Sequence, residues 1–257
     1  MVIGRRVVRM DEAGSTNDVA KGYGKTGEPE GLVVLAGRQT AGKGRMGRGW
    51  SSPEGGLYVS VLLRPKMRSQ DLLRMTVFSC VPVAKAIEEV CDQDVRIKWP
   101  NDLFLNGRKV GGILVEGVSK GAAIEFVVIG VGLNVNSTLE SIGEEGATSL
   151  EEESGKAVDV ARLLDSLVRD LDIFYKDLLR NKIDEDEYVK RSCTLGRQIE
   201  ARVGKETFRG KALYIGPDGA LVLRSEEGLV LRLSWVNETS IHATNSEGTD
   251  GATLRKD

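Results

Sequence analysis

Glycine and basic residues are concentrated in the segment GRQTAGKGRMGRGW, residues 37–50. Glycine lets a backbone approach a ligand closely, and Lys and Arg supply positive charge, so the segment predicts a loop that closes over an anion. Gly42 and Lys43 match part of the phosphate-binding motif G-x-x-x-x-G-K-[ST], but Gly44 stands where that motif needs a hydroxyl for magnesium. Because no helical period follows either, we interpret the segment as a mobile binding loop rather than a P-loop.

Arg45 and Arg48 are the cations of this loop that are best placed to share a ligand. They lie on either side of Gly47, so in a closed loop both guanidinium groups face one carboxylate or phosphate. An exposed turn whose arginines are solvated explains the same residues about equally well. The rest of the chain has to decide between the two interpretations.

The segment KWPND, residues 98–102, predicts a rigid corner, because the residue before a proline is restricted to extended geometry. This corner holds Asn101 and Asp102 at the beginning of a strand. An amide and a carboxylate there suit a polar ligand contact and a contact to magnesium or a ribose. A turn in which Asn or Asp bonds its own backbone is the ordinary alternative.

Lys109 lies in RKVGGILVE, where two adjacent glycines allow a ligand or another backbone to approach the sheet. A surface lysine after a hairpin is the ordinary alternative. Further along, Gly130 and Gly132 are followed by Asn134, with neither the helix nor the acidic residue of a dinucleotide-binding fingerprint. We interpret this stretch as a sheet edge that is open to a ligand, or else as a β-bulge.

Composition excludes several classes of protein. The 257 residues carry a formal net charge of −2 at pH 7 and 40% hydrophobic residues, as expected of a globular protein without wholesale affinity for nucleic acid. No apolar run approaches the roughly 20 residues of a membrane helix, and the N-terminus shows no secretion signal. We therefore expect a cytoplasmic protein that does not bind membranes.

The chain has three cysteines and one histidine. Cys80, Cys91 and Cys193 are far apart and lack C-x-x-C spacing, so we expect buried reduced thiols. His242 adjoins a polar tail, and no catalytic triad or histidine-metal site can be built around it. Any chemistry therefore depends on Lys, Arg, carboxylates and backbone dipoles.

The pattern of strands and helices predicts an α+β fold. Strands are expected at 7–10, 32–36, 57–63, 95–98, 103–105, 113–115 and 126–131. Helices are expected from a cap at Ser15–Asn17 as far as Ala20, from Ser69 towards Val90 with a kink or restart at Pro82, at 159–179 and at 184–191.

After Leu195 the pattern changes to short strands separated by turn signals, at 198–203, 207–215, 220–224 and 229–233. These strands predict a small β-barrel appended to the α+β part. We therefore divide the chain into residues 1–194, residues 195–242, and a polar tail at 243–257 that we expect to be disordered.

Taken together, the motifs resemble those of the biotin protein ligases. Ser15-Thr16-Asn17, GRQTAGKGRMGRGW, KWPND, RKVGGILVE and GVGLNVN occur in the order and spacing of that family, and the resemblance covers essentially the whole folded chain. It implies an α+β catalytic domain built on a mixed sheet, followed by a small SH3-like β-barrel. It also implies two reaction steps: biotin and ATP give biotinyl-5′-AMP and pyrophosphate, and a lysine of a biotin carboxyl carrier domain then takes the biotin.

The resemblance further implies a role for each motif residue. The expected biotin pocket consists of Ser15, Thr16, Asn17, Gln39, Gly42, Lys43, Gly44, Arg45, Lys109, Gly112 and Leu114. The expected ATP and adenylate contacts are Arg45, Arg48, Trp50, Asn101, Lys109 and Asn134. Arg45 and Lys109 are the catalytic residues in this interpretation, because they would meet the biotin carboxylate and the α-phosphate. Mg²⁺ is the expected metal, with Asp102 as its candidate ligand.

Two departures from the family pattern stand out. The family usually has arginine where this chain has Lys43 and Met46, which puts the ordering of the loop in question. Some relatives carry a DNA-binding helix-turn-helix before this region, but Ser15 follows the start so closely that we expect no DNA binding. A homodimer is the expected assembly.

Three rival interpretations are weaker. A lipoate ligase needs a histidine beside its glycine-rich motif, and residues 37–50 contain none. A non-catalytic biotin-binding protein would not need Arg45, Lys109 and Asp102 together. A P-loop nucleotide hydrolase is disfavoured by Gly44.

Overall fold

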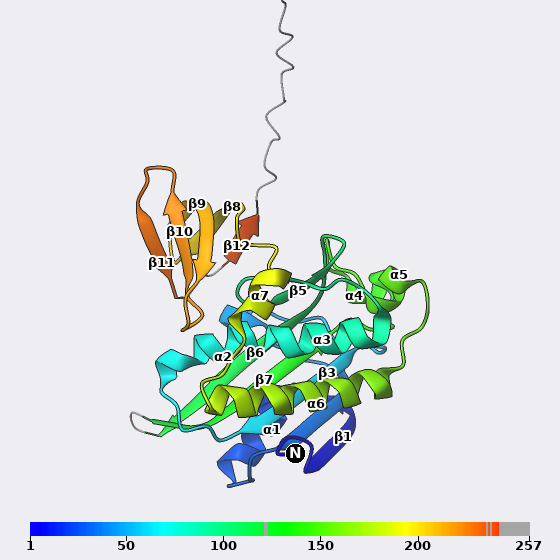
Figure 1. Cartoon of the computed structure of the whole chain (residues 1–257). Helices are drawn as coiled ribbons and strands as arrows, with labels where there is room; N and C mark the ends of the chain where they lie inside the picture. The colour runs from blue at the N-terminus through cyan, green and yellow to red at the C-terminus, as the bar shows by residue number, and fades with distance from the viewer. Residues whose placement is uncertain (121–122, 235, 237, 242–257) are drawn as a thin grey trace, which may run out of the picture.

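The computed structural model describes residues 1–120, 123–234, 236 and 238–241, and Figure 1 shows their arrangement. His242 and the tail at 243–257 lie outside the described residues, so both expectations stay predictions. Within the described residues no helix is long and apolar enough to cross a membrane.

The larger sheet contains β1 (Arg6–Ala13), β2 (Leu32–Gln39), β3 (Leu57–Leu63), β4 (Arg96–Lys98), β5 (Asp102–Leu105), β6 (Arg108–Lys120) and β7 (Ala123–Leu133). Their order across the sheet is β1-β2-β3-β7-β6-β5-β4. β1 pairs with β2 in parallel, and the other neighbours pair antiparallel, so the sheet is mixed. The predicted α+β class with a mixed sheet is confirmed. Asn106 and Gly107 form the predicted hairpin turn between β5 and β6, both with positive φ.

The helices are α1 (Thr16–Lys25), α2 (Leu72–Phe78), α3 (Cys80–Cys91), α4 (Leu139–Ile142), α5 (Leu150–Ser154), α6 (Val160–Leu179) and α7 (Glu185–Arg191). Short 3₁₀ turns, η1 (Arg45–Gly47) and η2 (Ser69–Asp71), complete the set. α6 matches its predicted span and begins where Asp159 accepts hydrogen bonds from the backbone N–H groups of Ala161 and Arg162.

Two helix predictions need correction. α1 does not stop before its glycines but continues to Lys25. Gly24 lies within this helix, and an added Cβ there would lie 2.6 Å from the Phe126 ring, so this glycine serves close packing rather than termination. The kink or restart expected in the helix from Ser69 is present, but it lies at Ser79 rather than at Pro82. Pro82 falls in the first turn of α3, where its missing N–H leaves no hydrogen bond unmade.

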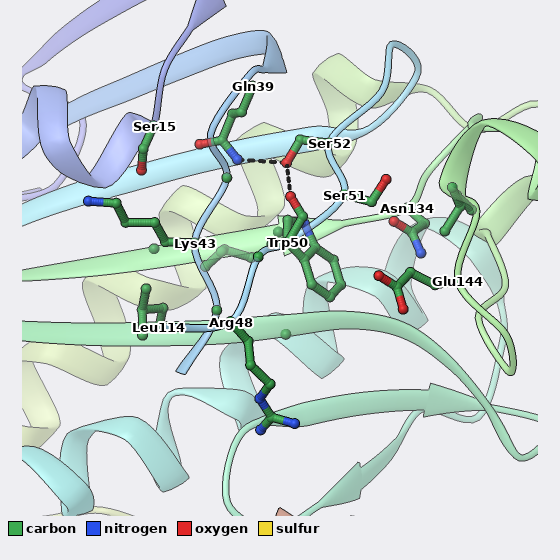
Figure 2. Close-up of a pocket in the computed structure, with 18 of the residues that line it drawn as sticks. Ser15, Gln39, Lys43, Arg48, Trp50, Ser51, Ser52, Leu114, Asn134 and Glu144 are labelled. Atoms are coloured by element: carbon green, nitrogen blue, oxygen red, sulfur yellow. Dashed lines mark hydrogen bonds between the residues drawn. The ribbon is translucent and has the colours of Figure 1, made fainter. Parts of the chain in front are cut away.

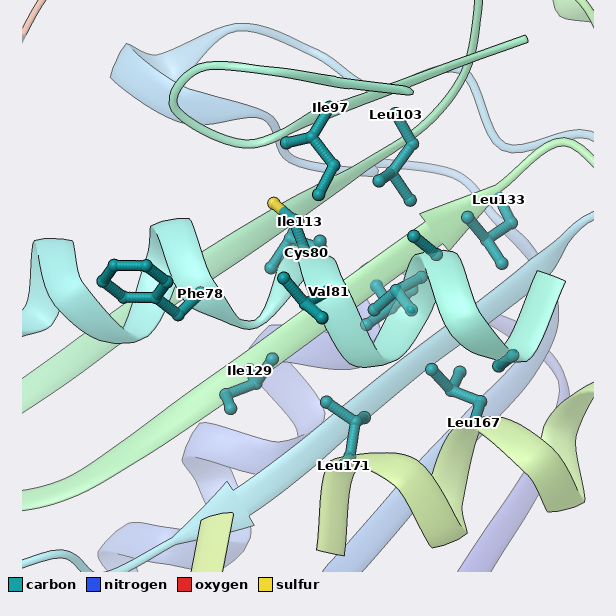
Figure 3. Packing of buried hydrophobic residues seen from close by; sticks show 14 of the residues in the cluster. Phe78, Cys80, Val81, Ile97, Leu103, Ile113, Ile129, Leu133, Leu167 and Leu171 are labelled. Atoms are coloured by element: carbon teal, nitrogen blue, oxygen red, sulfur yellow. The ribbon is translucent and has the colours of Figure 1, made fainter. Parts of the chain in front are cut away.

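Alternation along β7 divides its side chains between the two faces of the sheet. Ile129 and Leu133 face α3 and α6 within the main hydrophobic core, as Figure 3 shows. Phe126 and Val128 face the other way, into a smaller cluster that includes Ala20 of α1. α3 and α6 therefore cover one face (Figure 1), whereas α1 covers only part of the opposite face.

The smaller sheet contains β8 (Gln198–Val203), β9 (Glu206–Ile215), β10 (Leu221–Ser225), β11 (Val230–Leu233) and β12 (Glu238–Ile241), in the order β11-β10-β9-β8-β12 and all antiparallel. Four of these strands were expected, and β12, which pairs with β8, was not.

Trp99 connects the smaller sheet to the corner of KWPND. Its indole Nε1 donates to the carbonyl of Gly219 at 2.9 Å, and its own carbonyl accepts from Thr239 Oγ1 at 3.0 Å. Its backbone N–H donates to Thr194 Oγ1 at 2.9 Å. All three bonds are buried, so the corner is fixed by residues from beyond the larger sheet.

The cysteines are free, as predicted. Cys80 and Cys91 are buried, and burial raises the pKa of both thiols. Cys193 is only half-buried, which corrects the expectation for that residue.

Candidate active site

A cavity of about 1000 Å³ lies between the glycine-rich loop and the part of the sheet that α1 leaves uncovered. Every candidate residue from the sequence lines it: Ser15, Thr16, Asn17, Gln39, Gly42, Lys43, Gly44, Arg45, Arg48, Trp50, Asn101, Asp102, Lys109, Gly112, Leu114 and Asn134. Segments that are far apart in the chain therefore meet at one place. The individual roles expected for these residues stay predictions.

Gly130 and Gly132 form the floor of the cavity, on the face of β7 that continues from Phe126 and Val128. A Cβ on Gly130 would lie 2.2 Å from Asn17 Oδ1, and one on Gly132 would lie 2.5 Å from Trp50 Nε1. These glycines therefore make room for side chains of the protein itself. The expectation of a sheet edge or a bulge at this point was wrong, because β7 lies between β3 and β6 and pairs regularly with both here.

The polar end of the cavity is built at the beginning of α1. Gln39 Oε1 accepts hydrogen bonds from the backbone N–H and the hydroxyl of Thr16, at 2.8 and 3.0 Å, and Gln39 Nε2 donates to Ser52 Oγ at 2.9 Å. These bonds fix the orientation of the Gln39 amide (Figure 2). Ser15 occupies the N-cap position but makes no side-chain capping bond, so its hydroxyl is not committed to the helix.

Asn17 is held through both the nitrogen and the oxygen of its side-chain amide. Its Nδ2 donates to Glu116 Oε2 at 2.7 Å, and its Oδ1 accepts from Ser60 Oγ at 2.6 Å. Asn17 is 4% exposed and Ser60 is fully buried. Asn17 therefore shapes the wall of the cavity through bonds that are already made, whereas Ser15 keeps a hydroxyl available for a ligand.

The two expected catalytic cations reach the cavity from separate segments. Lys109 of β6 pairs with Asp102, with 2.7 Å between Nζ and Oδ1, and its ammonium lies 5.3 Å from the centre of the Trp50 ring. Arg45 of the loop donates to Asn101 Oδ1 at 3.3 Å and to the carbonyl of Val236 at 3.2 Å. The corner at residues 98–102 therefore holds both cations in place.

The positive charge of Arg45 is affected by one carboxylate and by a second arginine. Burial lowers the pKa of Arg45, the negative charge of Asp102 opposes that effect, and the nearby Arg48 lowers the pKa further. Arg45 and Arg48 are thus close enough to repel each other. A ligand with carboxylate or phosphate oxygens would relieve this repulsion, since arginine keeps its charge under all ordinary conditions.

The far end of the cavity contains an unpaired acceptor. Asn134 is 1% exposed, its Nδ2 donates to the carbonyl of Thr148 at 2.9 Å, and its Oδ1 has no partner among the described residues. A buried acceptor left unpaired costs about 1–3 kcal/mol, so a ligand N–H at this point would bind favourably. Figure 2 shows Asn134 and Glu144 at the opposite end of the cavity from Ser15 and Lys43.

A resident metal does not fit the described residues. They contain no group of three or more His, Cys, Asp or Glu side chains arranged to hold an ion. Asp102, the expected magnesium ligand, is already paired with Lys109. Magnesium at this carboxylate would have to compete with an ammonium group.

Sequence reasoning missed several residues of the site. Ser60 carried a signal, as the one polar residue in the apolar strand LYVSVLL, because a buried hydroxyl needs a partner. Glu116 also carried one, since it lies two positions beyond Leu114 in a strand and shares its face. Ser52, Glu144 and the carbonyl of Val236 had no comparable signal.

Comparison with known proteins identifies relatives of the chain. Residues 11–134 match the Biotin/lipoate A/B protein ligase family. The chain is 35% identical over 234 residues to "Bifunctional ligase/repressor BirA" of Bacillus spizizenii, covering 89% of this chain and 72% of the relative. It is 34% identical over 208 residues to "Biotin--[acetyl-CoA-carboxylase] ligase" of Paracoccus denitrificans, covering 76% of this chain and 85% of the relative.

A solved structure, "Biotin protein ligase from Aquifex aeolicus in complex with biotin and ATP", superimposes with a TM-score of 0.78 at 28% identity, covering 93% of this chain and 99% of that one. The sequence motifs, the family match and the fold thus indicate the same family. The chain belongs to the biotin/lipoate A/B protein ligase family.

Proposed function

We infer that the chain is a biotin protein ligase. It activates biotin with ATP to biotinyl-5′-AMP, releases pyrophosphate, and transfers the biotin to a lysine of a biotin carboxyl carrier domain. The observation that carries this conclusion is the meeting of Arg45 and Lys109, from the loop and from β6, at one cavity. The names of the relatives support biotin as the acid.

The chemistry explains why two cations are needed. A carboxylate and a polyphosphate repel each other, and attack of the carboxylate oxygen on the α-phosphorus adds charge to the phosphoryl oxygens. The P–O bond to pyrophosphate then breaks, and pyrophosphate leaves with the electron pair. Arg45 and Lys109, fixed beforehand by Asn101 and Asp102, stabilise that charge without reorganising during the reaction.

The layout of the cavity favours one orientation of the ligands. The ureido ring of biotin, with one carbonyl acceptor and two N–H donors, suits the hydroxyls and the amide at Ser15, Thr16 and Gln39. The adenine suits the other end, where Trp50 supplies a ring and Asn134 Oδ1 an acceptor for an exocyclic amine. The carboxylate and the α-phosphate then lie between the two ends, near Arg45 and Lys109.

The loop protects the product of the first step. Biotinyl-5′-AMP is a mixed anhydride that water hydrolyses. Gly42, Lys43 and Gly44 line the cavity beside Arg45, so the loop excludes water from the anhydride until a carrier lysine attacks its carbonyl carbon and AMP leaves.

Magnesium enters this proposal as part of the ATP substrate. Mg²⁺ commonly reaches nucleotide sites on the phosphates, keeps several waters, and takes one or two carboxylates from the protein. Asp102 is the carboxylate beside both cations, and we propose it as that contact. No step above depends on the metal.

The proposal extends to domains and assembly. Residues 1–194 form the catalytic domain and residues 195–242 an SH3-like barrel, supported by the separate five-stranded antiparallel sheet. The proposed location is the cytoplasm and the proposed assembly a homodimer. The homodimer is supported by β6, because its pairing with β5 ends at Gly112 and beyond Ile113 one edge of the strand is unpaired among the described residues. Sedimentation velocity tests the assembly: a monomer at every concentration would contradict the dimer.

One assay tests the function. The purified chain is incubated with ATP, magnesium and either biotin or lipoate, and pyrophosphate and the acyl-adenylate are measured, the latter by mass spectrometry. Pyrophosphate and biotinyl-5′-AMP formed with biotin support the proposal. Adenylate formed only with lipoate makes the chain a lipoate ligase, and biotin bound without turnover makes it a binding protein.

A further inference from the structure

The tip of the glycine-rich loop, residues 43–48, is tied to the protein on two sides. On one side Arg45 reaches Asn101 and Val236. On the other side the Lys43 ammonium pairs with Asp18, in the first turn of α1, with 2.5 Å between Nζ and Oδ2. Figure 2 shows the Lys43 side chain directed away from Arg48 and Trp50, so this lysine points out of the reaction centre.

Asp18 is itself anchored to the sheet. Its other oxygen, Oδ1, lies 2.9 Å from Lys21 Nζ, and that ammonium also lies 2.9 Å from Glu116 Oε1. Glu116 belongs to β6 and accepts a hydrogen bond from Asn17 in the wall of the cavity. The pair therefore links the loop tip to a network that continues through α1 into the central sheet.

The rest of the loop does not depend on this pair. At its base, backbone N–H groups of Thr40 and Ala41 donate to the carbonyls of Ala13 and Gly14, at 3.0 and 2.8 Å. Within the tip, the Gly44 N–H donates to the Arg48 carbonyl at 2.7 Å. The base is thus fixed and the tip keeps its own shape, so loss of the pair frees the tip to swing rather than unfolding the loop.

We propose that Asp18 is a positioning residue of the ligase: by holding Lys43 it keeps the loop tip over biotinyl-5′-AMP. The inference rests on the proposed function. Burial tends to raise the pKa of Asp18, but hydrogen bonds and charge from Lys43 and Lys21 outweigh it and lower the pKa, so the carboxylate stays ionised at neutral pH.

The strength of the pair suits a lid that must also open. Both side chains are partly exposed, 43% for Lys43 and 45% for Asp18. Exposed ion pairs are weak and are screened by salt. Such a tie slows escape of the adenylate while still yielding when a carrier domain arrives, because the carrier lysine cannot reach the anhydride through a closed loop.

The test compares Asp18→Asn, Lys43→Met and the double variant with wild type. Each enzyme first forms biotinyl-5′-AMP in a single turnover, and its release into solution is then followed without carrier. Because exposed pairs contribute little, each single variant should release the adenylate about two- to fivefold faster, and the double variant no faster than either single one. For Asp18→Asn, whose carboxylate does not line the cavity, the single-turnover rate of pyrophosphate formation should change by less than twofold.

The control is Glu200→Gln, which breaks a comparable exposed pair with Arg209 (Oε2–Nη2, 2.8 Å) on the smaller sheet. Its release rate should equal that of wild type, and Lys43→Arg should keep slow release, because it keeps the charge. Thermal denaturation of every variant separates positioning from misfolding.

Salt supplies a second measurement. Between about 0.01 M and about 1 M salt the screening length falls from about 30 Å to about 3 Å, so wild-type release should rise towards the Asp18→Asn value while that variant responds less. Unchanged release in both single variants, or equal salt responses, would overturn the inference. A wild-type chain that forms no biotinyl-5′-AMP would instead overturn the proposed function.

Discussion

Asp102 is the carboxylate that acts on both proposed catalytic cations, Lys109 and Arg45. It lies 2.7 Å from Lys109 Nζ, and its charge also acts on Arg45. Before ligands bind, the charge of Asp102 partly neutralises these two positive charges. Incoming carboxylate and phosphate oxygens complete the balance, so binding of the two substrates is favoured together although they repel each other.

Lys109→Met tests the catalytic assignment at this point. The thioether keeps much of the packing against Trp50 but removes the charge that would meet the transferred phosphoryl group. Loss of one preorganised donor lowers a rate by roughly 10²- to 10³-fold, and we expect that decrease in pyrophosphate formation under single-turnover conditions.

Lys98→Met is the matched control. Lys98 also lies over an aromatic ring, 5.6 Å from the centre of Phe104, but does not line the cavity. Its activity should match wild type. Equal activities of the Lys98 and Lys109 variants would remove Lys109 from the chemistry.

Gly132→Ala tests the floor of the cavity. The added Cβ would lie 2.5 Å from Trp50 Nε1, closer than real contacts allow, so the indole must shift. Trp50 belongs to the proposed adenine end of the cavity. If its contact with ATP loses about 1.4 kcal/mol, the KM for ATP rises about tenfold, which is the change that we expect. The dissociation constant of biotin should stay within about a factor of three. Steady-state kinetics and calorimetry provide the two values.

Gly22→Ala serves as the comparison, since a Cβ there meets nothing within 4 Å and the position is helical. It should leave both constants unchanged. A Gly132→Ala enzyme with normal KM for ATP would show that Trp50 does not contact the nucleotide.

At the scale of elements, ion pairs hold α7 in its place on the molecule. Glu187 accepts from Lys190 Nζ and Lys85 Nζ, each at 2.8 Å, and from Arg191 Nη1 at 2.9 Å. The hydrogen bond from Lys190, followed by that from Lys85, lowers the pKa of Glu187 from 4.5 to about 2. Lys85 belongs to α3, so this carboxylate ties α7 to the layer that covers the sheet.

The pH dependence of stability follows from that shift. A carboxyl whose pKa is lower in the folded state stabilises the fold fully above its unfolded value, and the contribution is lost as pH falls towards the folded one. Glu187→Gln should therefore lower the denaturation midpoint at pH 7 but have little effect near pH 2. Glu226→Gln, in an exposed turn, should change neither value, and a constant difference between pH 7 and pH 2 for Glu187→Gln would contradict this account.

Helices and strands were predictable from the sequence where the local pattern of apolar residues agrees with the tertiary packing. LYVSVLL is a strand over its full length, and the apolar period at 159–179 is one helix. A break in the helix from Ser69 was predictable from Pro82, but its position at Ser79 was not. The continuation of α1 past Gly24 was not predictable either, because the local sequence does not show that this glycine packs against the distant Phe126.

The same holds for the site. Motif residues could be gathered by resemblance, and all of them line one cavity. The roles of Asp18 and Val236 were not predicted from the sequence. Their contacts with the loop join residues that are far apart in the chain, so they depend on the tertiary structure.

At the scale of the whole molecule, the two sheets share one hydrophobic core. Ile199, Leu221 and Val236 of the C-terminal part belong to the same buried cluster as Ile129 of the larger sheet. The buried bonds of Trp99 lie at this junction. We therefore expect the two sheets to unfold in a single cooperative transition.

Trp99→Phe tests the junction. Loss of the indole N–H leaves the Gly219 carbonyl without its partner, which should lower the free energy of unfolding by about 1–3 kcal/mol. Tyr214→Phe, an exposed residue of the smaller sheet, should stay within about 0.5 kcal/mol of wild type. Chemical denaturation followed by circular dichroism measures both, and two separate transitions in the wild-type chain would show that the junction is weak.

The bond from Arg45 to the Val236 carbonyl has a consequence for any attempt to shorten the chain. A chain that ends at residue 194 would keep the larger sheet and lose the smaller one. It would also lose Val236, and with it one of the two hydrogen bonds that hold the Arg45 guanidinium. Such a chain would retain every side chain that lines the cavity, but the Arg45 guanidinium would be held less firmly in its orientation. The C-terminal part of the chain thus supports the proposed chemistry, although none of its strands lines the cavity.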